Sequence, residues 1–412
     1  MITVAEARAR ILALLTPLPA EPVALRDAAG RVLAEDIVAR RDQPPFAASA
    51  MDGYAVSDAD ARPGDQFDVI GEAAAGAGFS GSVTPGEAVR IFTGAPVPAG
   101  AHRVVMQEDV TRDGNRITLT DALDAGMNIR PAGGDFKRGD RITAPLRLGP
   151  AQLALTAAMN TPVVQVARRP VVAIMATGDE LVMPGETPGP DQIIASNSFA
   201  LRAMCEAEGA EVRLLPIARD TRESLETAFD LARGADLLLT SGGASVGAHD
   251  LVGPVAEALG MERAFYKVLM RPGKPLMAGK LGDMVVVGLP GNPVASIVCA
   301  QIFILPALRA MQGLSGDAPP EDTAPLAAPV GPNGPREHYM RARLGPEGVE
   351  IFDRQDSSLL SVLGAANVLV RRDAHDRARA AGETVRILHI YASRIFLFVY
   401  HLLTQMGNTG RT

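Results

Sequence analysis

The sequence predicts a multidomain protein that combines one α/β domain with several β-rich domains. Three continuous apolar runs indicate the α/β domain, and each ends in a loop that contains glycine: 171–176, 237–239 and 284–288. Runs of this kind are typical of parallel strands that are buried on both faces. We therefore expect the three loops at one carboxyl edge, where open α/β sheets bind ligands. The length of 412 residues suits about two to four domains.

The loop at 240–250 carries the clearest signal of a ligand site. Its sequence is TSGGASVGAHD, and a helix is expected directly after it, at 251–259. Gly242, Gly243 and Gly247 suit a loop with positive φ angles or a close backbone approach to a ligand. A strand followed by small residues and a helix presents backbone amides to an anion, although an ordinary strand–helix turn remains open. Asp250 can cap that helix, or it can hold a cation against a bound phosphate.

Charged residues follow the first apolar run and also flank a rigid turn. Asp179 and Glu180 come after the run at 171–176, whereas Arg271 and Lys274 lie on a proline–glycine turn with Lys267 shortly before it. Cations, glycine loops and carboxylates at one sheet edge suit a polyanion bound together with a divalent metal ion. Helix capping or simple solvation is the alternative for the carboxylates.

Composition excludes several classes of function. The net charge is −7 and aromatic residues make up only 4% with no Trp, so neither a basic nucleic-acid face nor a base-stacking platform is expected. No apolar run is long enough to span a membrane, and the N-terminus lacks the apolar segment of a signal peptide. Cys205 and Cys299 are expected to be buried, reduced thiols of a cytoplasmic protein. The histidines show no ligand-spaced pair, so a built-in zinc site is not expected.

Secondary structure can be assigned along much of the chain. An amphipathic helix is expected at 3–15, where Thr3 and Glu6 have the spacing of a capping box. Asp220 and Glu223 show the same spacing at the start of a second helix. The remaining assignments comprise helices at 151–159, 198–208, 221–233 and 294–312, and C-terminal strands at 338–344, 349–352, 368–371 and 384–390.

Seven motifs in a fixed order resemble the molybdopterin molybdenumtransferase family of the MoeA type, which includes the E domain of gephyrin. They are PPF at 44–46, SAMDGYA at 49–55, FTGAPVP at 92–98, TGDEL at 177–181, SGGASVG at 241–247, RPGKP at 271–275 and LPGNP at 289–293. Each motif alone is a weak signal, but together they cover roughly residues 1–390. The apolar segment within 391–412 has no counterpart in the family pattern, and we interpret that stretch as an atypical tail.

The resemblance implies the domain organisation. Residues 1–44 and 138–168 would form one elongated linker domain, and 45–137 would form a small β-rich domain between them. Residues 169–315 would be a molybdopterin-binding-type α/β domain with a mostly parallel sheet, followed by a C-terminal β-barrel-like domain at 316–390. The discontinuity of the first domain rests on the resemblance alone.

The resemblance also implies the chemistry. Such an enzyme takes adenylylated molybdopterin and molybdate, releases AMP and leaves molybdenum on the dithiolene sulfurs. Mg²⁺ or another divalent cation would be held by Glu180 and Asp250. The residues that match the family's catalytic positions are Asp52, Thr93, Asp135, Glu180, Asp220 and Asp250. For Asp220 a role as a helix cap is an equally good interpretation.

A second set of residues is expected to bind the substrates. The resemblance places molybdate near the LPGNP turn, together with two residues of the C-terminal domain. The full set is Thr177, Gly178, Asp179, Ser241, Gly242, Gly243, Ser245, Gly247, Lys267, Arg271, Lys274, Pro290, Pro293, Arg341 and Ser361.

The expected partners follow from the same resemblance. The protein would be a homodimer whose site forms between domains, and it would meet a molybdopterin adenylyltransferase and acceptor molybdoenzymes or their chaperones. Neither nucleic acid nor a membrane is expected as a partner. Two alternatives stay open at this point: molybdopterin adenylyltransferase activity, and a non-catalytic scaffold of the gephyrin kind.

Overall fold

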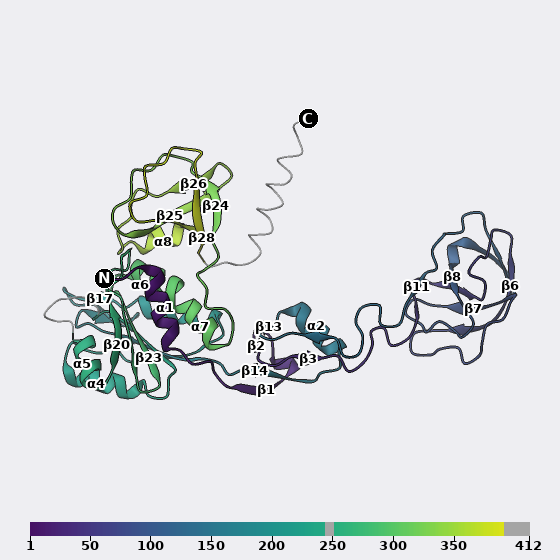
Figure 1. Ribbon diagram of the computed structural model, residues 1–412, viewed down its shortest axis with the longest axis horizontal. Helices are drawn as coiled ribbons and strands as arrows, with labels where there is room; N and C mark the ends of the chain where they lie inside the picture. Colours follow the sequence, from purple (N-terminus) through teal and green to yellow (C-terminus); the bar gives the residue numbers. More distant parts are fainter. Residues whose placement is uncertain (244–250, 391–412) are drawn as a thin grey trace. The chain divides into compact units, whose positions relative to one another are not determined.

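The computed structural model describes residues 1–243 and 251–390, which fall into two compact units (Figure 1). The first unit contains Met1–Ala20 and the chain from Ala167 onward, and the second contains Glu21–Val166. The residues outside the described ranges include the tail predicted at 391–412.

The first unit contains the predicted α/β domain. Its sheet has six strands, and β22 alone runs against the direction of the others, so the mostly parallel sheet is confirmed. In spatial order the strands are β18 (Glu211–Leu214), β15 (Val171–Ala176), β19 (Leu237–Ser241), β23 (Met284–Leu289), β22 (Met277–Leu281) and β20 (Glu262–Tyr266).

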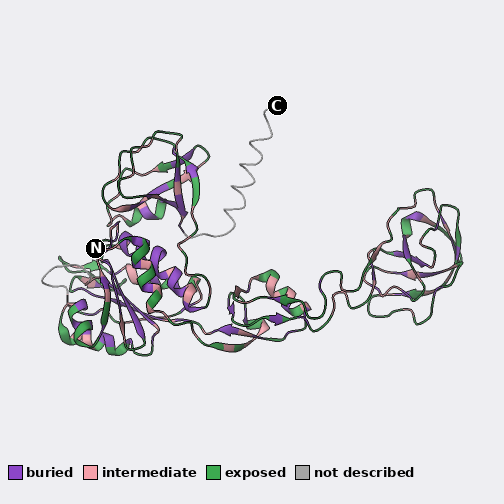
Figure 2. Cartoon of the chain, viewed as in Figure 1, coloured by how far each residue is buried: buried purple, intermediate pink, exposed green. Residues whose placement is uncertain are grey.

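Alternate residues of the strands enter two separate cores, one on each face of the sheet. Val172 and Ile174 belong to the larger core, whereas Ala173 and Met175 belong to the smaller one. Because side chains alternate across a strand, the central strands β15, β19 and β23 are buried on both faces (Figure 2). The larger core is covered by α1 (Val4–Leu14), α3 (Asn197–Ala207), α6 (Pro293–Cys299) and α7 (Leu305–Met311), and the smaller core by α4 (Arg222–Leu231) and α5 (Val252–Ala258).

The long apolar helix predicted at 294–312 exists, but it is interrupted by a π-helical turn. Residues Ala300–Ile304 form this turn between α6 and α7. Pro306 lies at the start of α7 and has no N–H to donate to the preceding turn. Among the described residues this is the helix that is long and apolar enough to cross a membrane, but 83% of its most apolar window is buried inside the protein.

Helix α1 joins the α/β domain, whereas the prediction assigned residues 1–44 to the elongated domain. The Thr3 hydroxyl accepts a hydrogen bond from the Glu6 N–H at 3.1 Å and so caps the helix as predicted. Val4, Ala7 and Ile11 lie in the larger core of the sheet. The apolar stripe was therefore correctly identified, but the sequence did not show which surface it covers.

The C-terminal β-domain also belongs to the first unit and shares part of its core with the α/β domain. Tyr339, Leu369 and Leu388 lie in the same hydrophobic cluster as the helices α6 and α7. The strands are β21 (Met270–Arg271), β25 (Glu337–Gly345), β27 (Val368–Arg372), β28 (Thr384–His389) and β24 (Asp322–Pro325), with β26 (Gly348–Ile351) paired to β25 and a short helix α8 (Leu360–Ala365). β24 and α8 were not predicted, because they lie in stretches rich in proline, glycine or alanine.

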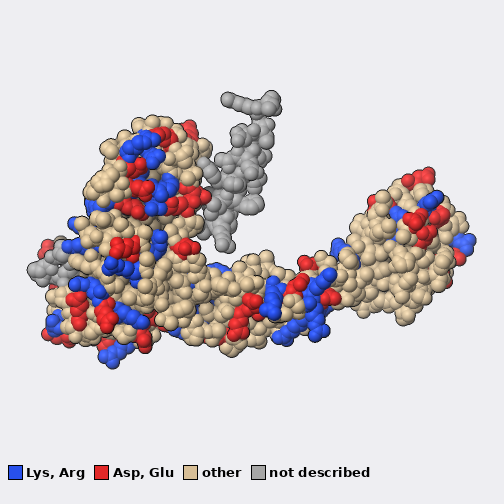
Figure 3. All heavy atoms as spheres, in the orientation of Figure 1, with Lys and Arg blue, Asp and Glu red and all other residues tan. Residues whose placement is uncertain are grey.

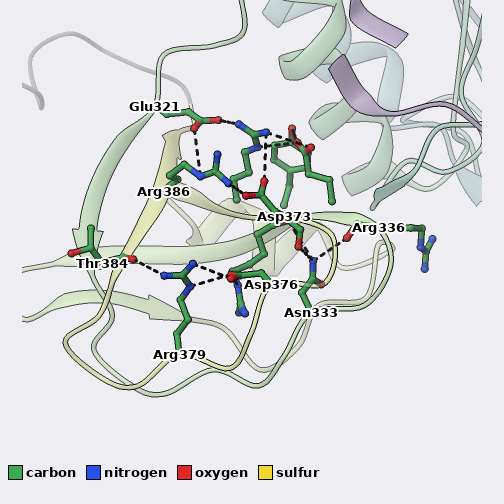
Figure 4. A network of polar contacts seen from close by, with 12 residues as sticks. Glu321, Asn333, Arg336, Asp373, Asp376, Arg379, Thr384 and Arg386 are labelled. Carbon is green, nitrogen blue, oxygen red and sulfur yellow. Dashed lines mark hydrogen bonds and ion pairs between the residues drawn. The ribbon is translucent and has the colours of Figure 1, made fainter. Parts of the chain in front are cut away.

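A network of ion pairs covers this β-domain. Arg386 pairs with Glu321 and Asp373, and Arg379 pairs with Asp376 (Figure 4). Arg371 joins Glu321 at 2.5 Å. Acidic and basic side chains accordingly lie intermixed on this domain in the face that Figure 3 shows.

The second unit contains two β-rich regions. Residues near 21–44 pair with residues near 138–166: β2 (Val32–Leu33) with β13 (Leu146–Arg147) and β14 (Val163–Ala167), and β3 (Ile37–Val38) with β12 (Arg141–Ile142). Helix α2 (Pro150–Ala158) belongs to the same region, as does β1 (Ala20–Ala24). The other region is a six-stranded sheet in the order β8 (Arg103–Met106), β5 (Gly53–Val56), β7 (Glu87–Ile91), β6 (Gln66–Ala73), β10 (Arg116–Leu119) and β9 (Val110–Asp113). Short strands β4 (Ala48–Ser49) and β11 (Ile129–Arg130) form a separate pair.

Candidate active site

The three loops that were expected at one sheet edge are joined by backbone hydrogen bonds. Thr177, which follows β15, donates its N–H to the carbonyl of Ser241 at 3.1 Å. Gly242 donates in turn to the carbonyl of Leu289 at the end of β23, at 3.3 Å. These loops line a pocket of about 650 Å³ that includes Thr177, Gly178, Ser241, Gly242, Gly243, Pro290 and Pro293. The parallel strands therefore bring together residues that lie more than one hundred positions apart in the sequence.

Glycine is required at the start of the 240–250 loop. The φ angles are +100° at Gly242 and +62° at Gly243, in the region that L-residues with side chains rarely adopt. A Cβ at Gly242 would lie 2.6 Å from the Thr177 carbonyl oxygen, and one at Gly243 would lie 2.2 Å from Cγ2 of Val252. The two glycines thus allow the loop to pass close to the first loop and to helix α5.

Carboxylates lie at the edge of this pocket. Glu180 and Asp220 line it, and the Glu180 carboxylate packs against Gly178. Asp179 is exposed, and its carboxylate accepts a hydrogen bond from the N–H of Asp220 at 3.3 Å. Asp220 is not the cap of helix α4: Thr221 has the extended backbone of an N-cap, and its hydroxyl accepts from the Ser224 N–H at 3.2 Å. The helix-cap interpretation of Asp220 was therefore wrong, because the next residue fills that position.

The LPGNP turn connects the pocket to the C-terminal β-domain. Asn292, between Pro290 and Pro293, donates its side-chain amide to the hydroxyl of Ser357 at 2.9 Å. Ser358 lines the pocket beside this turn. The wall of the pocket therefore contains residues from both domains of the first unit.

A polar side chain that the sequence analysis missed also lines the pocket. Asn197, the first residue of α3, donates its amide nitrogen to the Ser241 hydroxyl at 2.8 Å and to the Gly291 carbonyl at 2.7 Å. A single side chain thus joins the glycine loop to the proline turn. The helix start was predicted one residue later, and no periodicity in the sequence indicates a bridge between two distant loops.

In the second unit, Asp52 and Thr93 contact each other directly. Asp52 Oδ1 accepts hydrogen bonds from both the backbone N–H and the hydroxyl of Thr93, each at 2.7 Å. The bond from the backbone N–H, then that from the hydroxyl, lowers the pKa of Asp52 below its ordinary value of 3.8. Arg90 lies over the rings of Tyr54 and Phe92, with centroid distances of 5.0 and 4.8 Å, and its charge also favours the Asp52 carboxylate.

Sequence comparisons cover nearly the whole chain. Family models for the MoeA N-terminal region (domains I and II), a probable molybdopterin-binding domain and the MoeA C-terminal region (domain IV) match residues 2–160, 173–310 and 323–390. The molybdopterin molybdenumtransferase of Haemophilus influenzae is 35% identical over 397 residues, which are 94% of this chain and 98% of the relative. The chain belongs to the molybdopterin molybdenumtransferase (MoeA) family.

Further relatives agree with this assignment. The molybdopterin molybdenumtransferase of a Nostoc species is 38% identical over 305 residues, which cover 72% of this chain and 70% of the relative. The crystal structure of a molybdopterin biosynthesis MoeA protein from Pyrococcus horikosii is 29% identical and has a TM-score of 0.80, covering 94% of this chain and 99% of that one. The protein is therefore an enzyme of the MoeA family with a role in molybdenum cofactor biosynthesis, and the resemblance and the fold class predicted from its motifs are confirmed.

The cations that match the MoeA pattern lie apart from the residues that line the pocket. Among the RPGKP residues, Pro275 lines the pocket. Lys267 stacks over the Tyr266 ring at 4.9 Å, and Arg271 lies in β21, which pairs with β25. Lys274 is exposed next to Pro275. The turn that these cations flank thus reaches the pocket through its proline.

Arg341 and Ser361, which were expected near molybdate, take different positions in the MoeA C-terminal domain. Arg341 is 1% exposed, and its guanidinium donates to the carboxamide oxygen of Gln355 and, at 2.6 Å, to the carbonyl of Asp356. It therefore holds the segment that leads to Ser357 and Ser358. Ser361 is exposed on α8 and is not among the residues that line the pocket.

The other positions that match the MoeA pattern are distributed as follows. Asp135 is exposed on a turn of the second unit, and its N–H donates to the Gln43 carbonyl at 2.9 Å. Ser245, Gly247 and Asp250 lie outside the described residues. The described part of the chain holds no cluster of three or more His, Cys, Asp and Glu side chains that could bind a metal ion.

Proposed function

We propose that this enzyme inserts molybdenum into molybdopterin, with adenylylated molybdopterin and molybdate as substrates and AMP as a product. The observation that carries the proposal is the pocket at the carboxyl edge of the sheet, where three loops of the MoeA pattern are joined by hydrogen bonds. Its volume of about 650 Å³ lies in the range of small-molecule sites. The related proteins from Haemophilus influenzae and Nostoc carry the name of this activity.

The walls of the pocket suit a phosphorylated substrate. Thr177 and Ser241 supply hydroxyl groups, and Gly242 and Gly243 leave the backbone open to close approach. The Thr177 hydroxyl is buried and has no hydrogen-bond partner among the described residues. Since a buried unpaired hydroxyl is unfavourable, we infer that a bound oxyanion accepts its proton.

A divalent cation such as Mg²⁺ fits the carboxylates at the edge of the pocket. Mg²⁺ usually binds through one or two carboxylates, several waters and the phosphates of a substrate. Glu180 and Asp220 supply two carboxylates beside the pocket, and Asp250 would add to them. When bound, the cation would offset negative charge on the phosphates, while Glu180 and Asp220 would orient it.

The Asp52–Thr93 pair would also contribute to the catalysed reaction. Two hydrogen bonds keep the Asp52 carboxylate ionised and fix one of its oxygens, so that the other oxygen is available to a ligand. We extend the same role to Asp135 from the family pattern alone.

We further propose a cytoplasmic homodimer that receives its substrate from an adenylyltransferase and passes its product to molybdoenzymes or their chaperones. Size-exclusion chromatography with light scattering would test the homodimer.

The direct test is the release of AMP from adenylylated molybdopterin, with and without molybdate and Mg²⁺. We expect release by the native enzyme to need both additions, and to fall at least about 100-fold in Glu180→Ala and in Asp52→Ala, the order of loss when one electrostatic catalytic group is removed. Arg343→Ala, in β25 of the C-terminal β-domain, is the control and should keep full activity. Release that is independent of molybdate in well-folded enzyme would refute the proposal. Formation of adenylylated molybdopterin from ATP would instead indicate an adenylyltransferase, and inert but folded protein a scaffold.

A further inference from the structure

Asn197 makes a contact whose direction can be deduced from hydrogen-bond chemistry. Its side chain lies between the Gly291 carbonyl and the Ser241 hydroxyl, at 2.7 and 2.8 Å. A carbonyl oxygen can only accept a hydrogen bond, so the nitrogen of the Asn197 amide must face Gly291. The same nitrogen faces Ser241, because both distances are measured from Nδ2. The amide is therefore fixed in one orientation.

This orientation determines what the Ser241 hydroxyl can do. A hydroxyl has one proton to donate and can accept at its lone pairs. Since Asn197 has no proton-accepting atom at this contact, Ser241 Oγ accepts from it and keeps its own proton for another acceptor. Within the described residues no protein group accepts that proton, although Ser241 is only 3% exposed and lines the pocket.

We propose that Asn197 is a positioning residue that turns the Ser241 hydroxyl into a hydrogen-bond donor for a tetrahedral oxyanion in the pocket. The Thr177 hydroxyl has no hydrogen-bond partner among the described residues and lies across the same loop junction, because a Cβ at Gly242 would lie 2.9 Å from Thr177 Oγ1. One hydroxyl donor directly follows β15 and the other ends the neighbouring strand β19, and together they suit the oxygens of one phosphate or molybdate group. The inference rests on the proposed function only for the identity of that oxyanion.

The second bond of Asn197 has a separate effect. By donating to Gly291, the same amide holds the proline turn beside the glycine loop. Loss of Asn197 would therefore both free the Ser241 hydroxyl to rotate and loosen the turn. A double-mutant cycle with Ser241 separates these effects, because only the first one passes through the serine.

The test measures anion binding to the full-length protein by calorimetry, with AMP and with inorganic molybdate as separate probes. The variants are Asn197→Ala, Ser241→Ala and the double variant, with thermal unfolding recorded for each. Each single change should weaken binding of at least one probe roughly tenfold, because hydrogen bonds to charged groups are of that strength. The double variant should be no more than about threefold weaker than Ser241→Ala alone.

Two further variants sharpen the result. Asn197→Asp keeps the shape but replaces the donor by an acceptor, so Ser241 would donate to it and binding should be weaker than in Asn197→Ala. This variant also carries the cycle if Asn197→Ala does not fold. Asn367→Ala is the matched control: its amide donates to the Leu344 carbonyl at 3.0 Å in the C-terminal β-domain, and its loss should leave anion affinity unchanged.

The outcomes distinguish this inference from the proposed function. A selective loss of AMP affinity or of molybdate affinity would support the inference and show which oxyanion Ser241 meets. Equal effects of Asn197→Ala with and without Ser241 would overturn it, as would a native protein that binds neither probe. A native enzyme that binds AMP but does not release it from adenylylated molybdopterin would refute the proposed function and leave the role of Asn197 intact.

Discussion

Gly243→Ala tests why position 243 requires glycine: whether a side chain there would clash with a neighbour, or whether only the positive φ angle matters. A matched control exists in the same domain: Gly282, in the turn between β22 and β23, has a φ angle of +60°, close to the +62° of Gly243. A Cβ at Gly282 would meet nothing within 4 Å, whereas one at Gly243 would lie 2.2 Å from Cγ2 of Val252. Both substitutions incur about 1–2 kcal/mol of left-handed strain, and only Gly243→Ala adds a clash.

The clash sets the expected difference between the two variants. Val252 is buried at the start of α5 and, as a β-branched residue, it has few alternative rotamers. Forcing one extra methyl group into such a site costs about 1–3 kcal/mol. We therefore expect the free energy of unfolding to fall by about that much more in Gly243→Ala than in Gly282→Ala.

Urea unfolding followed by circular dichroism measures this difference, and AMP release measures its effect on the pocket. Gly282→Ala should keep activity, whereas Gly243→Ala should lose most of it. Adding Val252→Ala to Gly243→Ala should recover part of the stability that the clash removed. Equal losses of stability in the two glycine variants, or no recovery of stability with Val252→Ala, would show that a clash with Val252 is not the reason for glycine at position 243.

Three other expectations concern ionisable groups. Burial, followed by the charges of Arg271 and Arg341, lowers the pKa of His338 from 6.5 to about 4, so its neutral ring stabilises the fold above pH 6.5 and that contribution is lost as pH falls towards 4. As the pH is lowered between these values, the free energy of unfolding should therefore fall by up to about 3 kcal/mol less in His338→Gln than in the native protein. Urea unfolding at several pH values measures this, and an unchanged pH profile in the variant would contradict it. Thr93→Val should raise the pKa of Asp52 towards 3.8 in an NMR titration, because one of its two donors is lost; in the native protein the stabilisation from this pair is present above pH 3.8 and is lost as pH falls through the lowered value. Burial raises the pKa of Cys205 to about 12 and also raises that of Cys299, so neither thiol should react with a disulfide reagent at pH 8 until the protein is unfolded; rapid reaction of the native protein would refute the burial argument.

The sequence predicted those elements whose signal is local. The run Val171–Ala176 was assigned to its full length, because a strand buried on both faces has an uninterrupted apolar pattern. Placing three such strands in one parallel sheet also predicted that Thr177, Ser241 and Pro290 lie around one pocket. The Thr3 cap was recognisable for the same reason, since its partner is only three residues away.

What the sequence could not predict depends on contacts between distant segments. Asn197 acquires its role only because α3 begins beside two loops that come later in the chain. Arg341 matches the family pattern for a ligand residue, but its partners are Gln355 and the Asp356 carbonyl, which form its surroundings only after the β-domain folds. Helix α1 has a clear apolar stripe, and nothing in its spacing shows that the stripe covers a sheet that begins at residue 171.

The hydrophobic core that the α/β domain shares with the C-terminal β-domain limits how the protein can be divided. Leu369 and Leu388 are fully enclosed among residues of both domains, so a cut in the connecting segment near residue 315 would expose apolar surface on each fragment. The β-domain is thus not a removable module, although its sequence resembles one. A truncated chain that ends near residue 315 should aggregate or require its missing half in trans. It would also lose Ser358 from the pocket wall and the hydrogen bond that Asn292 donates to Ser357.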